Sequence, residues 1–344
     1  MVKDKVVKSK VVKDKVADTM KVADTVLEVD HLKLHFFTRK GVVRAVDDIS
    51  FDLKRGESLG LVGESGCGKT TTAFALLNMP PPPGRIVGGQ ILLGGEDIIP
   101  LSEDKMREKI RWEKISMVFQ GAMNCLTPVY TVGKQMMETL QEHRQMERPE
   151  AEKRIKKYLN LVGLPEDIVR RYPHELSGGM KQRVVIATSL FLEPDIVICD
   201  EPTTALDVVV QAQILNLIKE LKQKLGLSCI FITHDLATEA EVADRLVVMY
   251  AGKIVEIGTN EQIYGKKGPA HPYTQKLLAA TPRLHEAVEE LTFIPGAPPD
   301  LINPPPGCHF HPRCSEMMKK CREEEPPLVE VEPGHLVACW RCHG

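Results

Sequence analysis

One glycine-rich segment carries residue types that could hold a chain of phosphate groups. It matches the pattern G-x-x-x-x-G-K-[ST] and reads Gly63, Glu64, Ser65, Gly66, Cys67, Gly68, Lys69 and Thr70. An apolar run at 58–62 precedes it and an apolar helical run at 71–79 follows, so the match lies in the strand–loop–helix context that it requires. The loop N–H groups would face phosphates, Lys69 would reach the β and γ oxygens, and Thr70 would supply an oxygen to Mg²⁺. We therefore predict a site for a nucleoside triphosphate and Mg²⁺.

Two carboxylates follow another apolar run, at 196–199, which we expect to be a buried strand. Asp200 at the end of this strand can hold the Mg²⁺ shell, and Glu201 can orient or polarise the attacking water. Acidic residues at strand ends are common, but this pair comes in order after the phosphate loop. It predicts that the bound nucleotide is hydrolysed.

A second glycine-rich segment lies about a hundred residues after the first. It reads Leu176, Ser177, Gly178, Gly179 and Met180. Ser177 can cap a helix that begins near Met180, and the two glycines let backbone N–H groups approach a phosphate closely. Apolar residues then recur at helical spacing. Few classes of nucleotide enzyme carry two such anion sites in one chain.

These motifs, in this order, resemble the ATP-binding-cassette (ABC) family, whose signature normally reads Leu-Ser-Gly-Gly-Gln and here ends in Met180. The resemblance runs from about residue 26 to the C-terminus. It implies that Gln120, after the predicted strand 115–119, senses the γ-phosphate and Mg²⁺, and that His234 contacts the γ-phosphate. It also implies that Asp207 belongs to the loop that crosses to a partner subunit. The implied catalytic residues are Glu201, His234 and Gln120, and the implied Mg²⁺ ligands are Thr70, Gln120 and Asp200.

The resemblance further implies that two subunits hold ATP between them, head to tail. The phosphate loop of one subunit then faces the signature segment 176–180 of the other. The adenine would stack on an aromatic residue of the first sheet, Phe37 or Phe36. The expected ATP contacts are Phe37, Gly63, Glu64, Ser65, Gly66, Cys67, Gly68, Lys69, Thr70 and Thr71.

Further motifs resemble the dipeptide/oligopeptide permease branch of the family. They are the segments 203–213, 271–274 and 294–299, with Pro306-Gly307-Cys308 and Pro312-Arg313-Cys314 near the end. Met180 is typical of the D-type ATPase of this branch. The resemblance implies three kinds of partner, namely a second ATPase subunit, two transmembrane permeases and an extracellular peptide-binding protein. It places the chain peripherally at the cytoplasmic face of the cell membrane. A soluble ABC ATPase, or a nickel or oligosaccharide importer subunit, remains as an alternative.

Five of the nine cysteines crowd the last 37 residues. Short loops with several thiols suit a [4Fe–4S] cluster or structural Zn²⁺. Zinc sites favour paired C-x2-C spacing, which only Cys339 and Cys342 show, so we favour the cluster. Its predicted ligands are Cys308, Cys314, Cys321 and Cys339, with Cys342 free. Such a site would mainly fold a tail that is too small for a core of its own.

Composition and periodicity give the overall organisation. The formal net charge of −2 gives no attraction to nucleic acid, and we expect no such partner. No apolar run approaches the roughly 18–20 residues of a membrane span. Near-continuous apolar strands alternating with helices predict an α/β fold with a parallel sheet, and the resemblance adds an antiparallel β subdomain and an inserted helical subdomain. We expect a low-complexity disordered tail at 1–25, the nucleotide-binding domain at 26–260 with its helical subdomain at about 121–185, and a C-terminal extension at 261–344. The cysteine-rich tail would occupy 295–344.

Overall fold

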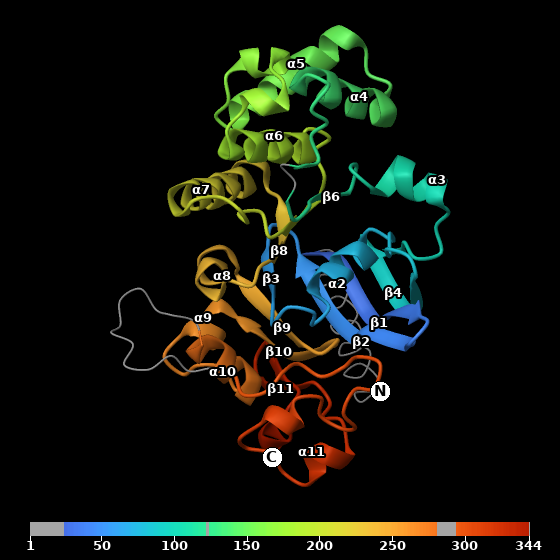
Figure 1. Ribbon diagram of the computed structural model, residues 1–344, viewed down its shortest axis with the longest axis vertical. Helices are drawn as coiled ribbons and strands as arrows, with labels where there is room; N and C mark the ends of the chain where they lie inside the picture. The colour runs from blue at the N-terminus through green and yellow to red at the C-terminus, as the bar shows by residue number, and fades with distance from the viewer. Residues whose placement is uncertain (1–23, 122–123, 281–293, 344) are drawn as a thin grey trace, which may run out of the picture.

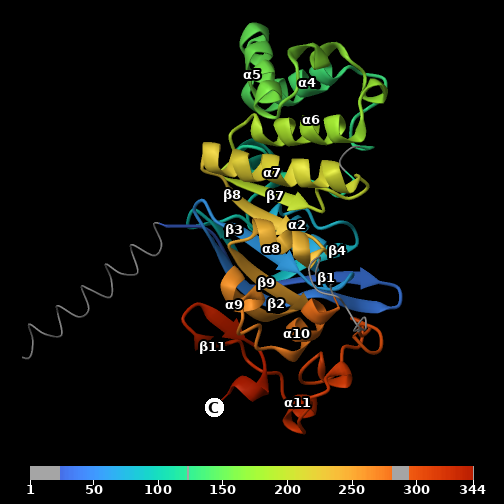
Figure 2. The ribbon, with the colours of Figure 1, turned by 90° about the vertical axis from the view of Figure 1, so that its left-hand side faces the viewer.

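The computed structural model describes residues 24–121, 124–280 and 294–343. The predicted tail at 1–25 lies outside these residues, apart from its last two. Figure 1 shows three tiers along the long axis. A helical lobe with α4, α5 and α6 lies at one end, the sheets lie in the middle, and the C-terminal segment with α11 lies at the other end. The view from the side in Figure 2 gives the same order.

The central sheet has eight strands in the order β11-β12-β10-β9-β3-β8-β7-β6. Five neighbouring strands, β9, β3, β8, β7 and β6, run parallel, and the remaining three continue the sheet in antiparallel fashion. Every residue of β3, β6, β7 and β8 is buried, which is why these strands read as continuous apolar runs. The bounds are β3 Ser58–Val62, β6 Ile115–Val118, β7 Ile196–Asp200, β8 Ser228–Ile232, β9 Arg245–Tyr250, β10 Lys253–Thr259, β11 Val329–Glu332 and β12 His335–Val337.

A second sheet is antiparallel, with the order β2-β1-β4-β5. Its strands are β1 Thr25–Thr38, β2 Gly41–Lys54, β4 Gly84–Leu93 and β5 Glu96–Asp97. It shares one hydrophobic core with helix α2 (Lys69–Leu76) and one face of the central sheet. The two faces of the central sheet belong to different cores, as alternate residues of β7 show. Ile196 and Ile198 lie in this core, whereas Val197 and Cys199 lie in the core of the helical lobe on the opposite face.

The helical lobe contains α4 Val132–Arg144, α5 Arg148–Leu161 and α6 Gly178–Leu190, and it packs on α7 Val208–Leu225. Within the helical subdomain expected at about 121–185, the structure forms α4 and α5 as two separate helices. Gln145 adopts a left-handed conformation with φ 46° and ends α4. The chain then turns, and α5 begins with Pro149 in its first turn, where proline's missing N–H has no intrahelical partner to lose.

The remaining elements are short. They are α3 Glu103–Lys105, α8 Leu236–Val242, α9 Asn260–Tyr264, α10 Pro272–Ala279 and α11 Lys320–Glu323, with single turns of other helix types at Met106–Ile110, Glu166–Arg170, Pro173–Glu175, His311–Arg313 and Trp340–Cys342. Within the ranges that the structure describes, every helix is too short or too polar to cross a membrane.

The C-terminal segment differs from the expectation of a tail held mainly by metal. Its hairpin β11–β12 joins the central sheet through β10, with Glu256 opposite Val337. Phe310 and Val337 are fully buried, Phe310 in a core shared with α10 and β9. Strand pairing and apolar burial therefore attach this segment to the domain, and the sequence did not show it because β12 has only three residues.

Candidate active site

The phosphate-loop motif lies between the carboxyl end of β3 and the first turn of α2. Gly63, Gly66 and Gly68 have φ values of 149°, 81° and 110°, which side chains other than hydrogen rarely tolerate. A Cβ atom at Gly63 would collide with the carbonyl of Met249, and one at Gly68 would collide with the carbonyl of Ala45. Two of the motif's glycines are thus required by the close approach of neighbouring backbone, before any ligand is considered.

Lys69, the first residue of α2, is buried. Its Nζ donates hydrogen bonds to the carbonyls of Gly63 (2.7 Å) and Glu64 (3.1 Å). Cys67 is buried beside it, with Sγ 3.7 Å from Nζ, and fills space under the loop. Ser65 and Gly66 lie exposed at the tip of the loop. The ammonium group is therefore held at the loop, where its charge is available to an anion.

Asp200 ends β7 next to the loop, and it is almost fully buried. Thr70 Oγ1 donates to Asp200 Oδ1 over 3.3 Å. The two predicted Mg²⁺ ligands are therefore neighbours in space, although 130 residues separate them in sequence. Burial raises the pKa of Asp200 to about 6. A divalent cation beside this buried carboxylate would stabilise its ionised form. Thr71, in the first turn of α2, is half-buried.

Glu201 is the centre of a second polar group at the same sheet edge. Its Oε2 accepts a hydrogen bond from Gln120 Nε2 (2.7 Å), and its Oε1 lies 3.0 Å from His234 Nδ1. Burial alone would raise the pKa of Glu201, but the hydrogen bonds from His234, Thr204 and Gln120 lower it on balance. The structure thus gathers all three predicted catalytic residues around one ionised carboxylate.

Thr204 belongs to this group and was not among the predicted site residues. Its Oγ1 donates to Glu201 Oε2 over 2.9 Å. Glu201 itself has φ 48°, a left-handed conformation that is uncommon for glutamate, and its N–H donates to the carbonyl of Ile232. The turn that this conformation starts brings Thr204 back to the carboxylate. In the sequence, the signal for Thr204 was a hydroxyl residue three positions after a carboxylate that directly follows a buried strand.

The second glycine-rich segment begins α6 as predicted. Ser177 is the N-cap, and its side chain accepts from the N–H of Met180 over 3.3 Å. A Cβ at Gly179 would meet the side chain of Val210 on α7, so this glycine lets the two helices approach. Leu176 is buried in the core of the helical lobe, and Met180 packs against it. Figures 1 and 2 both place α6 in the helical lobe, apart from α2, so the chain does not fold its signature segment onto its own phosphate loop.

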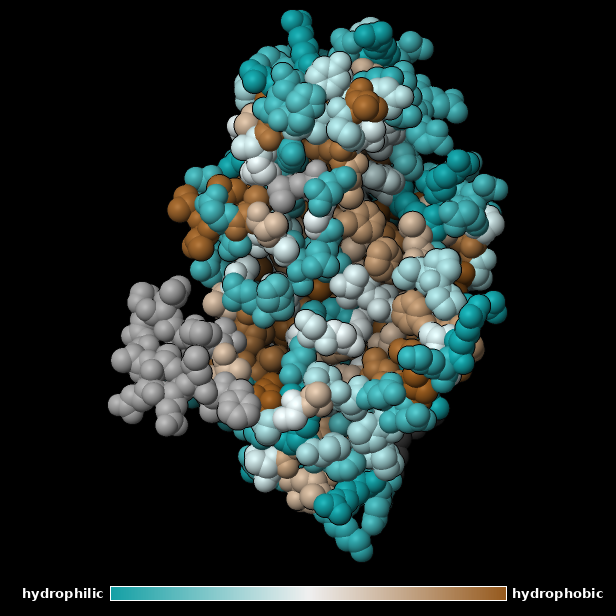
Figure 3. Space-filling view, viewed as in Figure 1, coloured by the Kyte–Doolittle hydropathy of each residue, from teal (hydrophilic) through white to brown (hydrophobic). Residues whose placement is uncertain are grey.

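Asp207 is the N-cap of α7, where its Oδ1 accepts from the N–H of Val210 (3.0 Å). The next two residues, Val208 and Val209, are 79% and 67% exposed. Figure 3 shows apolar side chains gathered on the surface over α7. Exposed apolar side chains gathered in one place commonly mark an interaction site, so this surface suits contact with another subunit.

The two candidate aromatic residues for adenine lie on opposite faces of β1. Phe36 packs against the core, whereas Phe37 is 46% exposed. The Arg85 guanidinium lies 5.8 Å from the centre of the Phe37 ring. Phe37 is therefore the more accessible of the two rings to a ligand.

Comparison with known proteins gives the family. One family model, described as ABC transporter, matches residues 46–204, and a second, described as oligopeptide/dipeptide transporter, C-terminal region, matches residues 255–321. The dipeptide transport ATP-binding protein DppD of Bacillus subtilis (strain 168) is 48% identical over 320 residues, which cover 92% of this chain and 95% of the relative. The oligopeptide transport ATP-binding protein OppD of Escherichia coli (strain K12) is 46% identical over 93% of this chain and 94% of its own length. The chain belongs to the ABC transporter ATP-binding proteins of the OppD/DppD type.

Solved structures of other family members agree with the fold. The dimeric structure of MJ0796, a bacterial ABC transporter cassette, covers 69% of this chain and 100% of that cassette, with a TM-score of 0.61 and 27% identity. The structure of cbiO1 from Clostridium perfringens, part of the ABC transporter complex cbiONQ, covers 71% of this chain and 92% of its own, with a TM-score of 0.61 and 29% identity. The predicted fold class and the prediction of an ABC-type ATPase subunit are confirmed, and so is the D-type inferred from Met180.

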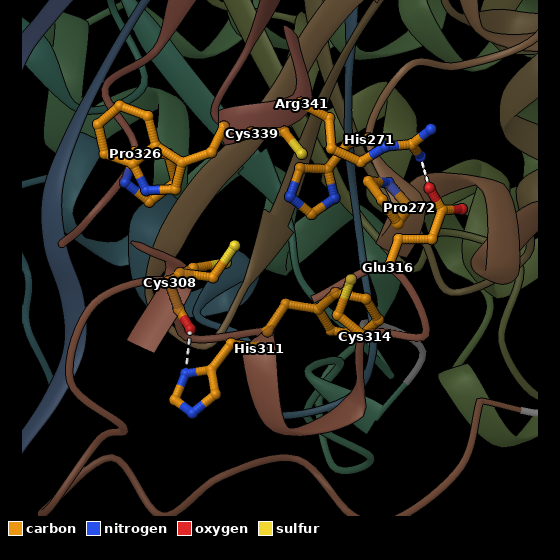
Figure 4. Close-up of a pocket in the computed structure, with 12 residues that line it drawn as sticks. His271, Pro272, Cys308, His311, Cys314, Glu316, Pro326, Cys339 and Arg341 are labelled. Carbon is orange, nitrogen blue, oxygen red and sulfur yellow. Dashed lines mark hydrogen bonds and ion pairs between the residues drawn. The ribbon is translucent and has the colours of Figure 1, made fainter. Parts of the chain in front are cut away.

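The four cysteines predicted to bind metal line one cavity in this OppD/DppD-type chain, at the C-terminal tier. Figure 4 shows the sulfur atoms of Cys308, Cys314 and Cys339 turned toward the space between them. His311 is turned away, and its Nδ1 lies 3.0 Å from the carbonyl of Cys308. Cys342 lines a separate groove. Across residues 24–121, 124–280 and 294–343, no three Cys, His, Asp or Glu side chains gather closely enough to hold one metal ion. The cluster and the zinc alternative stay predictions.

Proposed function

We propose that this ATPase subunit energises the import of dipeptides or oligopeptides. The observation that carries the proposal is the pair of matches over the ATPase domain and the C-terminal region, together with relatives that are named for dipeptide and oligopeptide transport. Its partners are a second ATPase subunit, two transmembrane permeases and an extracellular peptide-binding protein. The subunit acts at the cytoplasmic face of the membrane, bound to the permeases.

In the proposed mechanism, ATP lies between two subunits. The phosphate loop 63–70 would hold the phosphates, with Lys69 reaching the β and γ oxygens, and Thr70, Asp200 and Gln120 would hold Mg²⁺. Phe37 stacks on adenine. The segment 176–180 of the partner closes over the γ-phosphate, which accounts for its position away from this chain's own loop. Asp207 and the apolar start of α7 belong to the contact between the subunits.

Glu201 orients the attacking water in this mechanism, and His234 and Gln120 position its carboxylate. The lowered pKa of Glu201 keeps it ionised at neutral pH. Glu201→Gln keeps the shape and most of the hydrogen bonds but removes the charge. We expect this variant to bind ATP normally and to hydrolyse it at least 100-fold more slowly, as removal of one electrostatic catalytic group commonly does. Glu142→Gln, on the surface of α4, is the matched control. Hydrolysis at the wild-type rate in Glu201→Gln would contradict the assignment.

The transport role is tested on the assembled complex. Purification from native membranes should recover two membrane subunits with this chain. In vesicles that contain the complex and the binding protein, ATP should drive uptake of a labelled dipeptide or pentapeptide. Uptake of Ni²⁺ or an oligosaccharide in place of peptide would support another importer of the same branch. Recovery without any membrane subunit would favour a soluble ATPase.

The four cysteines that share the C-terminal cavity would hold a [4Fe–4S] cluster. Thiolates are the ligands that such clusters use, and His309 and His311 are engaged with the backbone carbonyls of Ala251 and Cys308. When bound, the cluster would join four separate stretches of the chain and so stabilise the C-terminal segment. Anaerobic purification should give iron and sulfide in equal amounts, lost in Cys314→Ser and kept in Cys342→Ser. A colourless protein with one zinc would decide for the alternative.

A further inference from the structure

The C-terminal segment reaches the phosphate loop through one arginine. Arg313 Nη1 and Nη2 donate to the two carboxylate oxygens of Glu64, over 2.6 and 3.0 Å. Glu64 is the second residue of the phosphate loop, and 249 residues separate the pair in sequence. The Arg313 side chain is only 6% exposed. Forked pairs of this kind are stronger and more directional than ordinary surface ion pairs.

The guanidinium of Arg313 is fixed on its other sides as well. Its Nε donates to the carbonyl of Pro295 (2.8 Å), and its Nη atoms lie 3.3–3.4 Å from the carbonyls of Ile294 and Gly296 and from the Tyr250 hydroxyl. Hydrogen bonding to Glu64 raises the pKa of Arg313, so the group stays charged. Five groups thus hold the arginine in one orientation, which limits the motion of the carboxylate that it binds.

Tyr273 of α10, in the C-terminal extension 261–344, holds the backbone of Glu64. The N–H of Glu64 donates to the hydroxyl of Tyr273 over 2.9 Å. The Tyr273 ring is fully buried between Tyr250 and Phe310, with ring centres 4.6 and 5.3 Å away. The N–H and the carboxylate of Glu64 therefore both face the C-terminal part of the chain.

The backbone carbonyl of Glu64 faces the candidate ATP site. It accepts from Lys69 Nζ over 3.1 Å, beside the carbonyl of Gly63. Contacts thus run without a break from Arg313 through Glu64 to the ammonium group that would meet the phosphates. They also place a negative side chain in a loop that must accept a highly negative ligand, and Arg313 supplies the compensating charge.

We infer that Arg313 is a positioning residue for ATP binding, supplied by the C-terminal segment. It fixes the start of the phosphate loop and neutralises Glu64, so that this carboxylate does not repel ATP. This inference rests on the proposed role of residues 63–70 in ATP binding. It makes the C-terminal segment a structural part of the nucleotide site, in addition to its proposed role in holding a cluster.

The experiment measures ATP affinity and turnover separately on the purified full-length chain. Arg313→Met is expected to weaken ATP binding about tenfold or more, the effect of losing a charge-assisted pair. The turnover of bound ATP should change little, because Arg313 does not touch the Glu201 group. Arg313→Lys should lose less affinity than Arg313→Met. Arg322→Met, an exposed arginine of α11, is the matched control.

The double variant gives the sharper test. In Arg313→Met the Glu64 carboxylate is left unpaired, so adding Glu64→Gln should recover part of the lost ATP affinity. A merely structural role for Arg313 predicts instead that the second substitution adds to the damage. Unchanged ATP affinity in Arg313→Met, or additive losses in the double variant, would overturn the inference.

A second pair of variants serves if Arg313→Met does not fold. Glu64→Asp keeps the charge but is too short to reach both guanidinium nitrogens, whereas Glu64→Gln removes the charge. We expect Glu64→Asp to weaken ATP binding more than Glu64→Gln, and the reverse order would refute the electrostatic argument. Failure of the proposed function looks different. In that case the wild-type chain itself would bind no ATP, and Lys69→Ala would change nothing.

Discussion

Glu239 in α8 offers a test of the energetics of the core. The residue is fully buried, and within the described part of the chain neither carboxylate oxygen has a hydrogen-bond partner. The carboxyl group rests against Gly60 of β3, where no other side chain could fit beside it. Burial, with a smaller effect of Asp235, raises the pKa of Glu239 well above 4.5. We predict that Glu239→Leu stabilises the protein.

The magnitude follows from two effects. A buried polar group without a partner costs about 1–3 kcal/mol even when it is neutral, and leucine removes that cost. The second effect depends on pH. The pKa of Glu239 is higher in the folded than in the unfolded state, so the folded protein binds the carboxyl proton more tightly. The stability that this proton binding contributes is fully present below pH 4.5 and is lost as the pH rises. The advantage of the leucine variant should therefore grow with pH, by up to about 1.4 kcal/mol per unit until the folded-state pKa is reached.

The assay is urea unfolding of the wild type and the variant at pH 5 and pH 8, followed by circular dichroism. Glu239→Gln should remove the pH-dependent part and keep the cost of an unpartnered amide. Glu241→Leu, exposed on the same helix, is the control and should change stability by less than about 0.5 kcal/mol. A Glu239→Leu variant that is less stable than the wild type, or whose gain is the same at both pH values, would refute the reasoning.

Three further predictions concern the site. Gly68→Ala should lower ATP affinity and the midpoint of thermal unfolding, because φ is 110° and the new methyl group would collide with the carbonyl of Ala45; an unchanged midpoint would argue against the strain. Because the pKa of Asp200 is raised to about 6, the Mg²⁺ concentration for half-maximal hydrolysis should rise as the pH falls from 7.5 to 5.5, and a flat Mg²⁺ requirement over this range would exclude Asp200 as a ligand. Val208→Asp should weaken ATP-dependent dimer formation by sizing chromatography while leaving monomer stability unchanged, since this residue is 79% exposed; an unaffected dimer would place α7 outside the interface.

The sequence alone predicted the parts of the site that depend on local pattern. Gly63 to Thr70 form a recognisable loop because backbone contacts at Gly63 and Gly68 exclude other residues. Asp200 and Glu201 could be placed because Asp200 ends a wholly buried strand and Glu201 follows it. Ser177 could be placed because its side chain caps the helix that follows. For Asp200, Glu201 and Ser177 the constraint lies within a few residues of the motif, whereas Gly63 and Gly68 are constrained by the carbonyls of Met249 and Ala45, and the glycine pattern itself reflects those contacts.

The features that sequence reasoning did not reveal depend on contacts between distant segments or on an uncommon backbone conformation. The pairing of β12 with β10 joins residues about 80 positions apart, and β12 has only three residues, too few to show a periodic pattern. Thr204 reaches Glu201 only because Glu201 adopts a left-handed conformation. Arg313 stood in a recognised C-terminal motif, but nothing in that motif pointed to Glu64. No local rule gives the partner of a long-range ion pair.

The late position of β12 and Arg313 has a consequence for synthesis on the ribosome. His335 of β12 follows its partner Glu256 by 79 residues, and Arg313 follows Glu64 by 249. At typical rates of about 5–20 residues per second, the edge of β10 stays open for roughly 4–16 s, and Glu64 waits longer still. An open strand edge is a template for wrong pairing. The nascent ATPase therefore completes its nucleotide loop among its last steps, and a chain that is released early carries both an exposed strand edge and an unpaired loop carboxylate.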